Sequence, residues 1–164
     1  MSGNDRLIGL PPIINADVTT LVLGSFPSPA SLAAGQYYAH RQNQFWRVMA
    51  DVLGEPFLEL DYADKQRCLL RHGVGVWDIY HTCQREGALD AAIKAAEPND
   101  FSQLVAVAPR LRRVCFNGQT AGRLASWFVG LGYETRILPS TSPAYTLVFS
   151  SKVARWREAW GLLH

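Results

Sequence analysis

The chain lacks the sequence signatures of several large protein classes, and these absences narrow its function. No stretch approaches the roughly 20 apolar residues that cross a bilayer, and the polar start MSGNDRL has no signal pattern. The three cysteines, Cys68, Cys83 and Cys115, form no C-x-x-C pair and have no histidine at metal-ligand spacing. We therefore expect free thiols in a reducing cytoplasm, no metal site and no membrane partner.

Strong charge and common enzyme motifs are also missing. The net charge of +2 is too small for a polybasic nucleic-acid binder, although it leaves room for a modest basic face. No G-x-G-x-x-G follows an apolar run, which disfavours a dinucleotide-binding protein. Ser25, at the end of an apolar run, keeps a serine hydrolase as an alternative. However, G-x-S-x-G is absent and the histidines fit no triad order.

What is present is typical of one globular domain spanning residues 1–164, with 48% hydrophobic and 18% charged residues. Apolar, β-branched runs alternate with amphipathic segments along the chain. They predict strands at 20–23, 74–80, 112–117 and 134–138, helices at 43–53, 61–71, 101–108, 118–130 and 149–162, and a short helix at 89–96. Because parallel strands need crossover connections, we predict an α/β fold: three α/β/α layers around a central four-stranded, mainly parallel sheet.

The longest irregular stretch runs from Gly24 to Asn43, directly after the first predicted strand. A connection of this length is uncommon in a compact domain unless it binds or catalyses something. In parallel sheets, ligands bind at the carboxyl ends of the strands. The later strands end at Asp78, at Asn117 and before the loop Pro139 to Tyr145, so we expect these residues to face the same side as the long segment.

Five short motifs occur in a specific order. They are GSFPS after the first strand, YYAH and N-x-FW before the first helix, G-V-x-V-W-D on the second strand, and PSTSPAY after the fourth. Together they resemble the uracil-DNA glycosylase superfamily and are most similar to its hypoxanthine-DNA (deoxyinosine) glycosylase branch. The resemblance covers Leu21 to the C-terminal helix. It implies a monomeric DNA-repair enzyme, without metal or other cofactor, that hydrolyses the N-glycosidic bond of a flipped deaminated base and leaves an abasic site. Hypoxanthine is the first expectation and uracil the second.

The chain departs from better-known members of this superfamily at two places. Those members carry Asp or Asn right after the first strand, where this chain reads Ser25-Phe26-Pro27-Ser28. They often carry His or Asn before the last Pro-Ser, where Leu138 stands. In the resembling branch the Asn before FW is catalytic, and that position is Asn43. The rival interpretation is that Asn43 only caps the helix that follows, and a non-catalytic module that binds nucleic acid or nucleotides also stays open.

The chemistry of base removal assigns roles to the remaining residues. A sugar cation and a departing base anion must be stabilised, and the flipped base needs an aromatic platform, for which Phe45 is the first choice with Tyr38 or Phe26 beside it. Hydroxyl groups and backbone amides are suited to binding DNA phosphates. Residues 143–145 are expected to fill the space that the flipped base leaves in the duplex. The predicted base-binding residues are Gly24, Ser25, Phe26, Tyr38, Phe45, Asp78 and Asn117, and the predicted DNA-binding residues are Pro27, Ser28, His40, Ser140, Thr141, Ser142, Pro143, Ala144 and Tyr145.

Simpler structural roles compete with these assignments. Phe45 begins an amphipathic helix and is typical of a core residue. In the rival interpretations, Asp78 holds a neighbouring loop through backbone N–H groups, Asn117 caps the next helix, and His40 is a hydrogen-bonded loop residue. PSTSP is an ordinary turn sequence. The cations of the last helix, Lys152, Arg155 and Arg157, form either a solvated face or a phosphate-steering surface.

Overall fold

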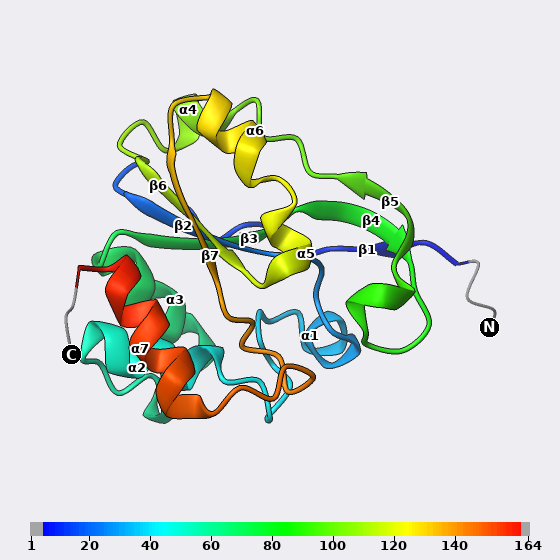
Figure 1. Ribbon diagram of the computed structural model, residues 1–164, viewed down its shortest axis with the longest axis horizontal. Helices are drawn as coiled ribbons and strands as arrows, with labels where there is room; N and C mark the ends of the chain where they lie inside the picture. Colours follow the sequence, from blue (N-terminus) through cyan, green and yellow to red (C-terminus); the bar gives the residue numbers. More distant parts are fainter. Residues whose placement is uncertain (1–4, 162–164) are drawn as a thin grey trace.

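The computed structural model describes residues 5–161, which are built around a four-stranded parallel sheet (Figure 1). Its strand order is β3-β2-β6-β7, and all three neighbouring pairs are parallel. The strands are β2 (Thr20–Gly24), β3 (Val74–Asp78), β6 (Arg113–Asn117) and β7 (Glu134–Leu138). The predicted α/β class and central parallel sheet are confirmed.

Helices cover both faces of this sheet, because its inner strands are apolar on both sides. On β2, Val22 packs into the core beneath α2, α3 and α7, while Leu21 and Leu23 pack into the core beneath α4, α5 and α6. The first group comprises α2 (Phe45–Leu53), α3 (Tyr62–Arg71) and α7 (Phe149–Ala159), and the second α4 (Leu104–Val107), α5 (Gln119–Gly122) and α6 (Ala125–Gly130). The three predicted layers are therefore present.

A second sheet, antiparallel and three-stranded, was not predicted. It has the order β1-β4-β5 and consists of β1 (Leu7–Ile8), β4 (Tyr80–Gln84) and β5 (Lys94–Pro98). The predicted strand 74–80 divides at Ile79, where the chain leaves the parallel sheet. The predicted helix at 89–96 is wrong, because its residues form the 3₁₀ turn η2 (Asp90–Ala92) and most of β5. Leu89, Ala92, Ile93 and Ala96 have helical spacing, but β5 pairs with the preceding strand β4, so this pairing overrides the local pattern.

Other predicted boundaries shift. The helix expected at 118–130 is two short helices, and the one at 101–108 is only one turn. The long segment contains α1 (Pro29–Ala34), and η1 (Phe57–Glu59) follows α2. The last helix ends at Ala159, and position 162 of the prediction lies outside the described residues. None of the described helices is long and apolar enough to span a membrane.

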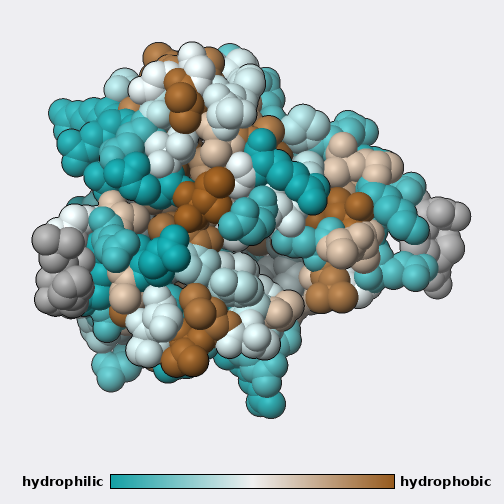
Figure 2. Space-filling model, in the orientation of Figure 1, coloured by the Kyte–Doolittle hydropathy of each residue, from teal (hydrophilic) through white to brown (hydrophobic). Residues whose placement is uncertain are grey.

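The carboxyl ends of the inner strands meet where the strand order reverses, which is where open α/β sheets bind ligands. Gly24 is paired with Asp78 across β2 and β3, and Asn117 lies at the end of the adjoining β6. A Cβ atom at Gly24 would lie 2.6 Å from Asp78 Oδ1, so only glycine fits there. Exposed apolar residues occur in several separate places on the face shown in Figure 2, and at the α4 and α6 end they include Val105, Val129 and Leu131.

Candidate active site

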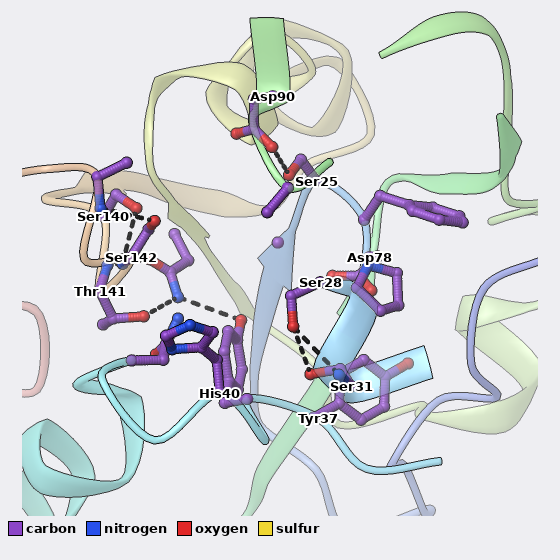
Figure 3. Close-up of a pocket in the computed structure, with 18 of the residues that line it drawn as sticks. Ser25, Ser28, Ser31, Tyr37, His40, Asp78, Asp90, Ser140, Thr141 and Ser142 are labelled. Carbon is purple, nitrogen blue, oxygen red and sulfur yellow. Dashed lines mark hydrogen bonds between the residues drawn. The ribbon is translucent and has the colours of Figure 1, made fainter. Parts of the chain in front are cut away.

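A cleft of about 270 Å³ opens at the carboxyl ends of the parallel strands. Figure 3 shows Ser140 and Thr141 on one side of it, Ser28 and Asp78 on the other, and Asp90 next to Ser25. Every residue that the sequence assigned to catalysis, base or DNA lines this cleft, except Phe45 and Pro143. The structure thus brings together segments that lie more than 100 positions apart in the chain.

The loop 139–145 is anchored to the strand ends by Asn117. The amide of Asn117 donates from Nδ2 to Thr141 Oγ1 at 2.9 Å, and its Oδ1 accepts the Thr141 N–H at 2.9 Å. Its Nδ2 also donates to Tyr38 Oη at 3.1 Å. The carbonyl of Thr141 accepts the N–H of Gln44, at the start of α2, at 2.9 Å. Both donor hydrogens of Asn117 are therefore used to assemble the cleft.

Helix α7 holds the same loop from beneath. Lys152 is only 1% exposed, and its Nζ donates to the carbonyls of Tyr145 at 2.7 Å and Ser142 at 3.4 Å. Trp156, fully buried, donates from Nε1 to the Pro139 carbonyl at 2.9 Å. The interpretation of Lys152 as part of a solvated face is wrong, because its ammonium group is buried and donates hydrogen bonds to the loop carbonyls. Burial lowers the pKa of its ammonium group.

Asn43 is half-buried at the mouth of the cleft, one residue before the N-cap of α2. Its Oδ1 accepts the backbone N–H of Phe45 at 2.9 Å. That bond fixes which end of the amide is oxygen, because a backbone N–H needs an acceptor. The N-cap itself is Gln44, without a side-chain capping bond, so Asn43 is not the cap that the rival interpretation expected, and its contact with Phe45 leaves Oδ1 with a second lone pair.

Asp78 forms the floor of the cleft and is 4% exposed. Its Oδ2 is one of four buried side-chain nitrogen or oxygen atoms in the described chain that have no hydrogen-bond partner. Burial, together with the smaller effect of the Asp90 charge, raises the pKa of this carboxyl to about 7, against the lowering effect of Arg85. Near neutral pH the group is divided between acid and carboxylate, and its protonated form offers a hydrogen-bond donor.

The aromatic platform expected at Phe45 is not at the surface of the cleft. Phe45 is fully buried and stacks beneath Tyr38, with ring centroids 4.1 Å apart. Tyr38, which lines the cleft, has a backbone φ of +57°, uncommon for a residue with a side chain. This placement corrects the prediction for Phe45, since its amphipathic helix buries it. Tyr38 and Phe26 are the predicted aromatics that line the cleft.

The opposite side of the cleft contains Asp90, which sequence reasoning missed, and Arg85, also missed, contacts the Phe26–Pro27 segment without lining the cleft. Asp90 accepts a 2.7 Å hydrogen bond from Ser25 Oγ. Arg85, 7% exposed, donates to the Pro27 carbonyl at 2.8 Å and lies over the Phe26 ring at 5.4 Å. Neither has a motif around it, and no other signal in the sequence marked either residue.

The remaining polar residues of the cleft mainly organise its turns. His40 Nδ1 accepts the Gln42 N–H at 3.1 Å, so its neutral form carries the proton on Nε2. Ser28 caps α1 by accepting the Ser31 N–H at 3.1 Å. Within residues 5–161, the hydroxyl of Ser25 bonds to Asp90 and to no histidine, so the cleft holds no hydrolase triad.

The cysteines are free and buried, as predicted, but the statement about histidine spacing is wrong. Cys68 and His72 are four residues apart at the end of α3, and Glu55 lies between them in space. Cys68 Sγ donates to Glu55 Oε2 at 3.0 Å, and His72 Nε2 is 3.8 Å from Glu55 Oε1. None of the three lines the cleft. The expected lack of a metal stays a prediction.

Comparison with known proteins agrees with this geometry. The model of the Uracil DNA glycosylase superfamily matches residues 11–164. A hypoxanthine DNA glycosylase of Methanosarcina barkeri is 38% identical over 152 residues, which cover 93% of this chain and 96% of the relative. A Methanosarcina acetivorans protein of the same name is 37% identical over 148 residues, 90% of this chain and 94% of the relative.

A solved structure shares the fold over nearly the whole length. It is the solution NMR structure of a Methanosarcina acetivorans protein described as a candidate uracil DNA glycosylase. Its TM-score is 0.84 at 36% identity, and the match covers 95% of this chain and 99% of that one. The cleft therefore lies in a fold shared with these relatives, and the chain belongs to the uracil-DNA glycosylase superfamily.

Proposed function

We propose that this protein is a DNA glycosylase that hydrolyses the N-glycosidic bond of hypoxanthine in DNA and leaves an abasic site. The observation that carries the proposal is that the Asn43 amide and the Asp78 carboxyl line one cleft, between the Ser25–Ser28 segment and the loop 139–145. The relatives named hypoxanthine DNA glycosylase support the choice of base. As the superfamily resemblance implies, we propose that the protein acts as a monomer.

Asn43 is the residue we assign to the attacking water. Cleavage of a nucleoside C–N bond develops positive charge on the sugar, so the water needs positioning more than activation. The Phe45 N–H holds Asn43 Oδ1 in one orientation, and the second lone pair of that oxygen can bind water beneath the sugar. This contact with the first residue of α2 thus fixes the amide for this task.

Asp78 is the residue we assign to the departing base. Its buried Oδ2 has no partner within the protein, and a base edge would supply one. A protonated carboxyl offers one donor and one acceptor, which match the adjacent carbonyl and N–H of hypoxanthine. Donation to the carbonyl stabilises the charge that the base gains as it leaves. Uracil carries the same kind of edge and is the second candidate.

The test uses labelled oligonucleotides with a single deoxyinosine or deoxyuridine, treated with alkali after incubation with the protein. We expect strand breaks at deoxyinosine, reduced at least about 100-fold in Asn43→Ala because the water loses its position. Gln103→Ala, an exposed amide change at the start of α4, is the matched control and should cleave like wild type. Binding without cleavage by the wild type would establish the non-catalytic module instead.

A further inference from the structure

A second depression adjoins the cleft on the side of α2 and α7, and it is lined by cations. We call it the cationic groove and define it by Arg41, Arg47, Lys152, Pro143 and Thr146. None of its lining residues is acidic. In a chain whose net charge is only +2, three cations without a lining carboxylate make this a local concentration of positive charge.

The two arginines of the groove differ from most other arginines in this protein. Among the described residues neither Arg41 nor Arg47 has an ion-pair partner. In contrast, seven arginines face a carboxylate: Arg6, Arg67, Arg71, Arg110, Arg113, Arg136 and Arg157. The protein neutralises arginines over much of its surface and leaves those of the groove available to an external anion.

Arg47 is also held in place before any ligand arrives. Its guanidinium carbon lies 4.0 Å from the centre of the Phe149 ring, at the start of α7. Stacking on a ring engages the flat face of the guanidinium and leaves its edge N–H groups for a planar or tetrahedral oxyanion. Such positioning lowers the entropy cost of binding a phosphate.

The groove and the cleft share two lining residues, Asn43 and Tyr145. Tyr145 is 47% exposed and belongs to the segment expected to fill the gap left by a flipped base. A nucleotide held in the cleft would therefore place the next phosphate of its strand beyond Tyr145, over the groove. We propose that the cationic groove binds the phosphodiester that adjoins the flipped nucleotide on the damaged strand. This inference rests on the proposed function.

Binding to a deoxyinosine oligonucleotide at several salt concentrations tests the groove. We expect Arg47→Ala and Arg41→Ala to weaken binding and to reduce the slope of log affinity against log salt by about one each. In cleavage assays KM should rise while kcat changes little, because these side chains do not reach the reacting atoms. Arg47→Lys should restore most of the slope, since it restores the charge.

Arg110→Ala is the matched control, because Arg110 is exposed and precedes β6, at the end of the sheet opposite the cleft. Its salt slope should equal that of the wild type. If the wild type cleaves and the Arg47 and Arg41 variants keep the wild-type slope, the groove proposal is overturned. If the wild type binds but does not cleave, the proposed function fails, and the slopes still decide whether the groove binds phosphate.

Discussion

The two sides of the cleft are built differently. The loop side, residues 139–145 with 37–43, is fixed by the half-buried side chain of Asn117 and the buried side chains of Lys152 and Trp156. The insert side, residues 88–90, is exposed, and a single hydrogen bond from Ser25 to Asp90 joins it to the segment after β2. Exposed segments with few anchors open at low free-energy cost, whereas buried hydrogen-bonded ones open only with the domain.

This difference suggests a division of labour. Asn43 and the loop expected to hold DNA lie on the fixed side, where a small displacement would misplace the attacking water. Asp90 lies on the exposed side, and we expect that residues 88–90 move to admit a bulky flipped nucleotide. Asp78 lies on the floor between them, and its pKa responds to Asp90. Four substitutions test this comparison.

The largest effect is expected from Asp78→Asn on the floor of the cleft. The folded-state pKa of about 7 lies above the unfolded value, so the stability that the protonated carboxyl contributes is lost as the pH rises through 7. Between pH 4 and 8 this should cost the wild type about 3–4 kcal/mol of unfolding free energy. The variant should not show this loss, as measured by denaturant unfolding at both pH values.

The same substitution sharpens the catalytic assignment of Asp78. Wild-type cleavage should fall above pH 7, as the carboxyl loses the proton that it donates to the base. Asp78→Asn should lack this alkaline decline, because an amide donates at every pH. A wild-type rate that stays constant from pH 6 to 9 in single-turnover assays would contradict the role of the protonated acid.

Breaking the fixed side should have the next largest effect. Asn117→Ala removes two bonds to Thr141 and one to Tyr38. We expect the unfolding free energy to fall by about 2–3 kcal/mol because buried partners are left unsatisfied. The cleavage rate should fall more than tenfold, because loop 139–145 is no longer held in its position at the strand ends. Chemical denaturation and single-turnover rates measure the two effects, and an unchanged rate would show that the loop needs no such anchor.

A smaller effect is expected from Lys152→Met, which removes the donor to the carbonyls of Ser142 and Tyr145 but keeps the apolar stem. The unfolding free energy should fall by about 1–2 kcal/mol, and DNA binding should weaken at low salt. Arg155→Met, on an exposed position of the same helix, is the matched control and should change stability by less than about 0.5 kcal/mol. Equal losses in both variants would contradict the anchoring role.

The smallest effect on stability is expected on the exposed side. Asp90→Asn should change the unfolding free energy by less than about 0.5 kcal/mol, because the residue is exposed. Because the charge of Asp90 raises the pKa of Asp78, its removal should move the alkaline decline of cleavage to lower pH. A shift to higher pH would contradict the coupling of Asp90 to Asp78, and a large loss of stability would show that the exposed side is as firmly fixed as the loop side.

Segments with strong local signals were predicted correctly, whereas segments that depend on tertiary pairing were not. The strands 20–24, 113–117 and 134–138 were predicted nearly to the residue, because apolar runs bounded by glycine, proline or polar residues are local signals. Strand β5 was missed because it lacks β-branched residues and is exposed, and only its pairing with β4 makes it a strand. The site residues on strand ends and loops were found through their motifs, whereas Arg85 and Asp90 had none.

The sequence by itself determined the alternation of strands and helices, the superfamily motifs and the two polar loops, because these depend on neighbours along the chain. Only the tertiary structure decided that Phe45 lies behind Tyr38, that Lys152 supports a loop and that Asp78 is buried without a partner for one oxygen. Burial, unsatisfied hydrogen bonds and pKa shifts arise from residues that are distant in sequence and meet only in the folded molecule.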